Sequence, residues 1–137
     1  MKINPYLMFD GRCAEAFAFY ATALGGTVEM MMTFGEAPER CPQTTTEWDD
    51  KIIHASLLVG DQRLMGADVP PQYQETPQGF SVSINVEDVG EAERIFGALG
   101  EGATITMPMG ETFWALRFGM LVDRYGTPWM VNCSRPR

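Results

Sequence analysis

The sequence predicts an α+β fold of two tandem βαβββ modules, each a curled mixed sheet with one helix, with a cleft between the sheets. Two observations predict this fold. The order strand, helix, strand, strand, strand occurs twice along the chain, and one proline-rich segment without periodicity separates the two occurrences. We expect the first module over residues 1–68, the linker over 69–78 and the second module over 79–137.

The first module is expected to begin with a strand over Lys2–Phe9 and a helix over Arg12–Leu24. Apolar residues recur at helical spacing in this helix, and the pair Gly25-Gly26 ends it. Its predicted buried stripe consists of Ala16, Phe19, Tyr20 and Ala23. The segments that follow are a strand, a polar loop and the two strands of a hairpin, over Thr27–Phe34, Gly35–Asp50, Lys51–Val59 and Arg63–Asp68.

The second module is expected to repeat this order. Its first strand, Phe80–Asp88, alternates strictly, so that Val82, Ile84 and Val86 would face the helix. The cleft side of this strand would then carry Ser81, Ser83 and Asn85. The elements that follow are a helix with the stripe Ala92, Ile95, Phe96 and Leu99, and three strands, over Val89–Gly100, Ala103–Pro108, Thr112–Val122 and Thr127–Cys133.

Residue similarity between the modules supports the repeat. The helical stretch EAFAFYATALGG corresponds to EAERIFGALGEG, and MMMTFGE corresponds to MPMGE. The hairpin LLVGDQRLM corresponds to MLVDRYGTPWM. Because five elements recur in the same order, a chance recurrence of two amphipathic segments explains the pattern less well.

Composition excludes several classes of protein. The net charge of −8 disfavours nucleic acid and anionic membrane as partners, since both need a basic surface. The sequence has no apolar run of membrane-spanning length and no leader, and we expect a cytoplasmic protein. The three cysteines are widely spaced and form no CxxC pair, which disfavours a disulfide framework or a zinc knuckle.

The chain resembles the vicinal oxygen chelate superfamily, which includes glyoxalase I, bleomycin-resistance proteins and extradiol dioxygenases. The resemblance rests on AFAFYATALGG in the first helix and on LVDRYGTPWMV near the C-terminus. More narrowly, NPYLMFDG, KIIHASLLVGDQRLMGAD, TPQGFSVSINVED and ETFWALRFGMLVDRYGTPWMVNC resemble the PhnB-like family, which is also labelled 3-demethylubiquinone methyltransferase-like. The resemblance covers essentially the whole chain and implies a glyoxalase-like fold and a homodimer.

The resemblance also implies four positions at which metal-dependent members carry a ligand, on the first and last strand of each half. In this sequence these positions fall on Pro5, Met65, Ser81 and Met130. Hard divalent metals need carboxylate or imidazole ligands, which none of these residues supplies. We therefore expect no catalytic metal and no cofactor.

His54 is the only histidine, and strand alternation places it toward the cleft, where an imidazole could act as a base or an acid. Counting back from Val59 and Val122 matches His54 with Arg117, whose guanidinium could hold a carboxylate or phosphate. His54 and Arg117 are thus the candidate catalytic residues. The favoured alternative is that each is paired with a nearby acid for stability alone, such as Glu111, Asp49 or Asp50.

Several further side chains have two possible roles. Trp114 could stack on a planar ligand or pack in the core or at a subunit boundary. The methionines Met30, Met31, Met32, Met107 and Met109 could line an adaptable pocket, although core filling is the favoured interpretation. Cys13 is the first residue of the first helix, a position that lowers the pKa of a thiol. No histidine lies beside it in the sequence, so it is interpreted as a residue without a role in chemistry.

Two functions remain open. The favoured hypothesis is a protein that binds a small molecule in the cleft without turnover, and the alternative is a metal-independent enzyme. The expected ligand-binding residues are His54, Met65, Ser81, Ser83, Glu111, Trp114, Arg117 and Met130. A methyltransferase is disfavoured because neither strand-to-helix turn, FDGRCAEAF or VEDVGEAE, contains the glycine-rich pattern of a nucleotide-binding doubly wound sheet.

Overall fold

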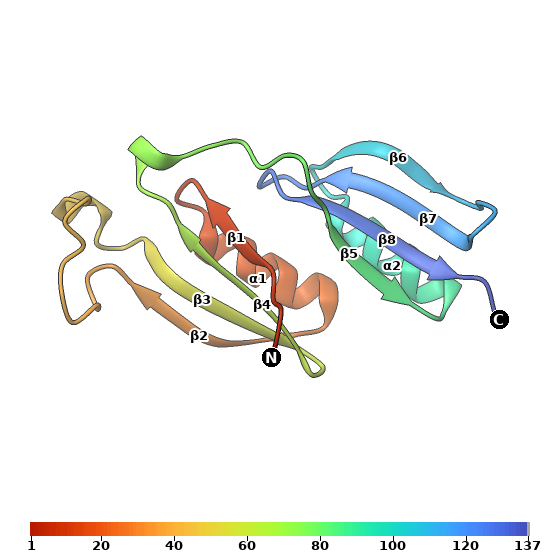
Figure 1. The fold of residues 1–137 in the computed structure, drawn as a ribbon, viewed down its shortest axis with the longest axis horizontal. Helices are drawn as coiled ribbons and strands as arrows, with labels where there is room; N and C mark the ends of the chain where they lie inside the picture. Colours follow the sequence, from red (N-terminus) through yellow and green to blue (C-terminus); the bar gives the residue numbers. More distant parts are fainter. Residues whose placement is uncertain (137) are drawn as a thin grey trace. The chain divides into compact units, whose positions relative to one another are not determined.

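The first half of the chain forms one mixed sheet with the strand order β1-β4-β3-β2 (Figure 1). Its strands are β1 (Tyr6–Phe9), β2 (Thr27–Thr33), β3 (Ile52–Val59) and β4 (Gln62–Asp68). β1 pairs with β4 in parallel, whereas the other neighbours are antiparallel. The helix α1 (Cys13–Leu24) covers one face of the sheet, as Figure 1 shows.

The second half repeats this arrangement with the strand order β5-β8-β7-β6. Its strands are β5 (Val82–Val86), β6 (Thr104–Gly110), β7 (Ala115–Val122) and β8 (Pro128–Ser134). β5 pairs with β8 in parallel, and the helix α2 (Val89–Leu99) covers one face (Figure 1). The predicted α+β fold of two repeated modules is therefore confirmed, with two open mixed sheets.

The computed structural model describes residues 1–136. The chain divides into two compact units, Met1–Glu75 and Thr76–Arg137, and the boundary falls within the segment 69–78 that the sequence marked as a linker. Short 3-10 helices lie at Thr46–Trp48 and Pro71–Tyr73, both in segments expected to be loops. None of the helices within 1–136 is long and apolar enough to cross a membrane.

The buried side of α1 differs from the predicted stripe at three residues, because it includes Cys13 and Phe17 and does not include Phe19. Cys13, Ala16, Phe17, Tyr20 and Ala23 are buried, whereas Phe19 is only partly covered. Phe17 packs directly over Gly66 of β4, where a Cβ atom would lie 3.0 Å from the Phe17 ring. The absence of a side chain at Gly66 thus lets the helix approach the sheet closely.

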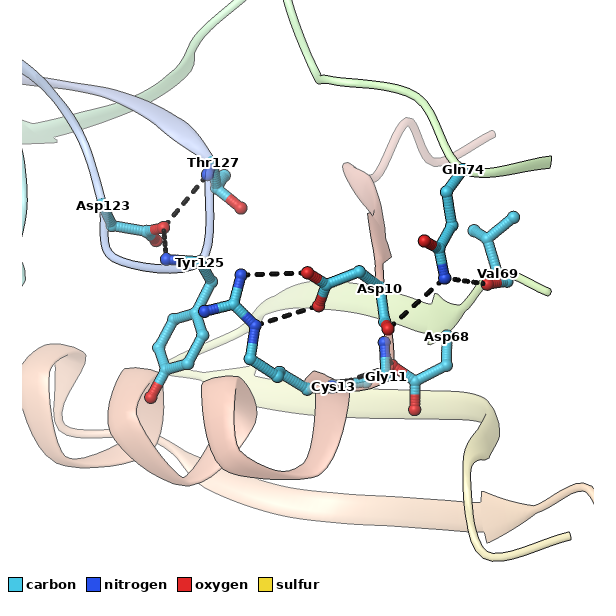
Figure 2. A network of polar contacts seen from close by, with 10 residues as sticks. Asp10, Gly11, Cys13, Asp68, Val69, Gln74, Asp123, Tyr125 and Thr127 are labelled. Atoms are coloured by element: carbon cyan, nitrogen blue, oxygen red, sulfur yellow. Dashed lines mark hydrogen bonds and ion pairs between the residues drawn. The ribbon is translucent and has the colours of Figure 1, made fainter. Parts of the chain in front are cut away.

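Asp68, at the end of β4, is a buried carboxylate that joins the first strand-to-helix turn to the sheet. One oxygen accepts hydrogen bonds from the backbone N–H groups of Gly11 and Cys13, and the other accepts from Ile52, each at 2.9 Å. Figure 2 shows Asp68 beside Gly11 and Cys13. Since every donor is a backbone group in the same unit, this buried acid stabilises the fold.

Asp123 is a second buried carboxylate, and it accepts backbone hydrogen bonds within the β7–β8 turn of the second unit. It accepts from the backbone N–H groups of Tyr125 and Thr127 at 2.8 and 3.0 Å, and Figure 2 shows these bonds. Its other oxygen accepts from the indole N–H of Trp129 at 2.8 Å. This turn and the following strand are therefore held by one buried carboxylate.

Candidate functional site

Each sheet has one face that its own helix does not cover, and strand pairing defines which residues lie there. In the first unit one row crosses all four strands on this face: Tyr6 pairs with Met65, Met65 with Ser56, and Ser56 with Met30. The neighbouring row, which contains Gly66, faces α1. We define the first helix-free face by Tyr6, Met8, Met30, Met32, His54, Ser56 and Met65.

His54 and Tyr6 form the polar pair of the first helix-free face. The Tyr6 hydroxyl lies 3.0 Å from His54 Nδ1, and the two rings are 5.7 Å apart. With Nδ1 unprotonated, the hydroxyl donates to the imidazole, and the other tautomer reverses the roles. Partial burial raises the pKa of Tyr6 from its ordinary value, so the phenol keeps its proton at neutral pH.

Glu29, Ser56 and Arg63 form a second cluster of polar side chains on the same sheet. The Glu29 carboxylate accepts from the Ser56 hydroxyl at 2.8 Å and forms an ion pair with Arg63. These bonds hold the pKa of Glu29 below its usual range, with the Arg63 hydrogen bond as the largest cause. The acid is therefore charged and paired at neutral pH.

The second unit presents the corresponding row on its own helix-free face. Ser83 pairs with Met130, Met130 with Met120, and Met120 with Met107. The next row contains Asn85, Asn132 and Phe118. We define the second helix-free face by Ser83, Asn85, Met107, Phe118, Met120, Met130 and Asn132.

The two rows show where the four predicted ligand positions lie. Met65 and Met130 occupy corresponding places, each beside the first strand of its sheet, as the sequence indicated. Their partners on those strands are Tyr6 and Ser83, however, and not Pro5 and Ser81. Pro5 precedes β1, and Ser81 precedes β5.

The residues paired in these rows do not fit a hard divalent metal either. Tyr6, Met65, Ser83 and Met130 include no carboxylate and no imidazole, which are the groups such a metal prefers. Within residues 1–136, no three His, Cys, Asp or Glu side chains gather as a possible metal site. We therefore derive no chemistry through a metal, and the expected metal-free state stays a prediction.

The predicted equivalence of His54 and Arg117 is wrong. In the aligned rows, His54 lies two residues before Ser56, and Phe118 lies two residues before Met120. Arg117 faces the other side of its sheet, where its guanidinium bonds Glu93 of α2 at 3.0 Å. The error arose because the β7–β8 turn is longer than the β3–β4 turn, so counting from Val59 and Val122 shifted the register by one residue.

The acids expected to neutralise His54 and Arg117 have other partners. Glu111 pairs with Arg135 at 3.3 Å, and Asp49 pairs with Arg40 at 2.8 Å. Arg117 is paired with an acid, as the favoured alternative had it, but that acid is Glu93. Arg117 therefore has a structural role between β7 and α2.

Trp114 lies just before β7 and not in the core. Its side chain is 45% exposed, and its ring packs edge-on against Phe118 at 5.2 Å and against Phe113 at 4.9 Å.

The predicted core filling by methionine is wrong for Met30 and Met107, which are both exposed. None of the ten methionines belongs to the buried core within residues 1–136.

Cys13 is fully buried, and its surroundings raise the pKa of its thiol. Burial is the main cause, and the nearby Asp68 carboxylate adds to it. The position at the start of α1 therefore does not activate this cysteine, in agreement with its interpretation as a residue without a role in chemistry.

Tyr6, Glu29 and Arg63 were missed as candidate site residues. For Tyr6 the signal was present in the sequence: if Leu7 and Phe9 face the helix, then Tyr6 and Met8 must face away from it. For Glu29 there was no such signal, because an irregularity in β2 between Val28 and Met30 breaks the alternation at this residue.

Comparison with known proteins identifies the family of this chain. The model of a family described as 3-demethylubiquinone-9 3-methyltransferase matches residues 1–132. The protein YjdN from Escherichia coli is 34% identical, and the match covers 96% of this chain and 95% of YjdN.

Two solved structures of high similarity have the same fold. Protein PA1353 from Pseudomonas aeruginosa is 50% identical, with a TM-score of 0.89 over 99% of both chains. The PhnB protein from Bacillus cereus is 27% identical, with a TM-score of 0.77 over 98% of this chain and 100% of that chain.

More distant structures share the fold alone. A glyoxalase/bleomycin resistance/dioxygenase family enzyme from Burkholderia phytofirmans is 17% identical, with a TM-score of 0.64 over 96% of this chain and 97% of that chain. The bleomycin-binding protein from Streptomyces verticillus is 19% identical, with a TM-score of 0.59 over 98% of this chain and 97% of that chain. These two comparisons show a shared fold of two βαβββ units.

Proposed function

The chain belongs to the family described as 3-demethylubiquinone-9 3-methyltransferase, and from this premise we propose that it binds a small organic molecule, as its glyoxalase-like fold allows. The ligand contacts the helix-free face of the first unit, and the second unit has a helix-free face of its own. From the predicted site, the proposal includes His54 and Met65 on the first face and Ser83, Trp114 and Met130 in the second unit. Arg117 and Glu111 are left out because each is occupied by an ion pair.

The main support for the proposal is the hydrogen bond between Tyr6 and His54. Tyr6 is 40% exposed, and the pair joins β1 to β3 on the side away from α1. A pair needed only for stability would more often be buried and fully satisfied. An accessible hydroxyl and imidazole can instead donate to, or accept from, a bound molecule.

Methionine supplies the apolar part of the same surface. Met8 and Met30 are exposed at 55% and 41%, and Met65 lies in the row between Tyr6 and Ser56. Unbranched thioether side chains adapt their shape to a ligand and contact aromatic rings favourably. Polar groups that fix orientation, set among apolar side chains, are typical of small-molecule sites.

Methyl transfer receives less support, although the family description names it. Within residues 1–136 both sheets are mixed, and each is four-stranded, unlike the doubly wound parallel sheet that commonly binds nucleotide cofactors. The bleomycin-binding protein from Streptomyces verticillus shows that the shared fold can serve binding. The negative charge also leads us to propose that neither nucleic acid nor an anionic membrane is a partner, and the cytoplasmic location stays a prediction.

A metal-independent enzyme is the second candidate, and the same hydrogen bond favours it. Tyr6, with its raised pKa, could keep a proton that it shares with His54, so that the pair transfers a proton to or from the ligand. Under this alternative the bound molecule would be converted, whereas a binding protein would return it unchanged.

The test is recovery of small molecules from the protein after incubation with a metabolite extract, followed by mass spectrometry. We expect wild type and the exposed helix variant Thr22→Ala to retain the same compound, and Tyr6→Phe and His54→Ala to retain much less. Equal recovery from all four proteins, or none from wild type, would contradict the proposal. The recovered compound is then incubated with fresh protein: conversion by wild type but not by His54→Ala would establish the enzyme instead.

A further inference from the structure

Two asparagines lie side by side on the second helix-free face. Asn85 of β5 pairs with Asn132 of β8 in the strand register, and Asn132 Nδ2 donates to Asn85 Oδ1 at 3.3 Å. The other hydrogen of Asn132 Nδ2 goes to the Ser134 hydroxyl at 3.0 Å. Both amide hydrogens of Asn132 are thus used, which fixes the orientation of its side chain.

This orientation leaves a complementary donor and acceptor. Asn132 Oδ1 is shielded from water and has no hydrogen-bond partner within residues 1–136. An unpaired buried acceptor is costly, and native structures rarely keep one without a reason. Asn85 is exposed, and its Nδ2 has no partner among the same residues because only its oxygen is engaged by Asn132.

Three aromatic side chains, Phe113, Trp114 and Phe118, lie next to this asparagine pair. Phe118 is the cross-strand partner of Asn132, and the Trp114 ring packs edge-on against Phe118 at 5.2 Å. Trp114 is 45% exposed and Phe113 is 89% exposed. Both Asn132 and Trp114 adjoin Phe118, so a ring-sized molecule bound at Trp114 would lie near Asn132, and side chains must shift for it to reach the shielded Asn132 Oδ1.

Among the described residues near this row, Glu111, Arg135 and Arg117 are paired, whereas Glu87, two residues after Asn85, is exposed. Glu111 and Arg135 form an ion pair at 3.3 Å, and Arg117 lies on the opposite face of the sheet, bonded to Glu93. Asn85, Asn132 and Phe118 do not ionise. An anionic ligand would lose water without gaining an opposite charge from these residues, and a neutral ligand avoids this cost.

We propose that Asn85, Asn132 and Trp114 form a subsite for a neutral planar ring with an amide edge, that is, a carbonyl next to an N–H. The ring stacks on Trp114, Asn85 Nδ2 donates to the carbonyl, and Asn132 Oδ1 accepts from the N–H. This inference rests on the proposed function and names the chemistry of the ligand group that the second unit would take.

The experiment titrates benzamide, which has both the ring and the amide edge, into ¹⁵N-labelled protein. Its controls are N,N-dimethylbenzamide, which lacks the N–H, and acetamide, which lacks the ring. We expect benzamide to shift the side-chain amide resonances of Asn85 and Asn132 and to bind about tenfold more tightly than either control, a typical value for one hydrogen bond or one aromatic contact.

Three variants locate the effect. Trp114→Leu and Asn132→Leu should each weaken benzamide binding about five- to tenfold, the typical loss for one such contact. The matched control Tyr73→Leu, which removes another exposed aromatic ring, should not. If Asn132→Leu loses its native spectrum, Asn85→Ala replaces it, because Asn85 is exposed and its loss leaves the core intact.

The inference is overturned if benzamide binds no more tightly than N,N-dimethylbenzamide, or if the Asn132 resonances do not move. Because the chain has one histidine, the His54 ring signals report separately on the first helix-free face. Benzamide that shifts only His54 would overturn the amide subsite and leave the proposed function standing. Loss of the proposed function would show instead as a chain that retains no metabolite.

Discussion

The carboxylate of Asp68 accepts a hydrogen bond at 2.9 Å from the backbone N–H of Cys13, 55 residues earlier in the chain. The same carboxylate holds Gly11 and Ile52, so three backbone donors from two segments depend on one buried side chain. This relationship joins the start of α1 to the two central strands of the first sheet. It therefore positions β1, which carries Tyr6.

Asp68→Asn should destabilise the protein strongly although it keeps the shape of the side chain. The amide nitrogen would face a backbone N–H, which leaves a buried donor unpaired and lowers the free energy of unfolding by about 2–3 kcal/mol. Urea unfolding measures this change. The control is Asp10→Asn, which removes the charge of an exposed carboxylate paired with Arg12 and should cost less than about 1 kcal/mol. Equal losses in the two variants would contradict the role given to Asp68.

Asp10 also predicts a pH dependence. The hydrogen bond from Arg12 lowers the pKa of Asp10, despite an opposing contribution from burial. A carboxyl group whose pKa is lower in the folded state stabilises that state above its unfolded pKa of about 3.9 and loses this contribution as the pH falls through the folded pKa. In NMR titrations, Arg12→Gln should return the pKa of Asp10 toward its ordinary value. An unchanged Asp10 titration would show that the ion pair does not form in solution.

Two glycines should respond in opposite ways to alanine. A Cβ at Gly66 would lie 2.8 Å from the Leu7 carbonyl oxygen and 3.0 Å from the Phe17 ring, so Gly66→Ala should lower the free energy of unfolding by about 1–3 kcal/mol. A Cβ at Gly97, within α2, would meet nothing within 4 Å. Gly97→Ala should therefore stabilise the protein by up to about 1 kcal/mol, through helix propensity. Thermal unfolding of both variants checks the pair, and a stabilised Gly66→Ala would show that α1 does not pack on β4 as described.

The three thiols should differ in reactivity. Cys13 and Cys133 are fully buried, and the pKa of Cys13 is raised, whereas Cys41 is partly exposed in the loop before β3. Iodoacetamide at neutral pH should therefore modify Cys41 first, since only an accessible thiolate reacts. Peptide mass spectrometry identifies the modified site, and urea should make all three reactive. Rapid modification of Cys13 in the native protein would contradict its burial.

We also predict a homodimer, on the family resemblance. The exposed apolar side chains Met8, Met30, Met107 and Trp114 are consistent with a partly buried surface in an assembly. Multi-angle light scattering should give twice the mass of 15.2 kDa that one chain has. A monomer mass across a hundredfold range of protein concentration would rule the dimer out.

Local pattern was sufficient for much of the fold. The helical spacing around Tyr20 and Ile95 predicted α1 and α2 almost to the residue, and alternation predicted the two faces of β5. The repeat predicted two similar sheets, and it correctly matched Met65 with Met130. These features depend on residues near one another in the chain, where the periods of 3.6 and 2 are visible in the sequence.

The candidate site depended on pairings between distant segments. That Tyr6 lies beside Met65, that His54 corresponds to Phe118, and that Arg117 faces α2 all follow from register across turns of different length. Side chains alternate along a strand, so a slip of one residue moves each side chain to the opposite face. The sequence by itself determined the elements, their order and the residue types available. Only the tertiary structure decided which of those side chains share a face, because hydrogen bonding between strands, and not spacing along the chain, sets the register.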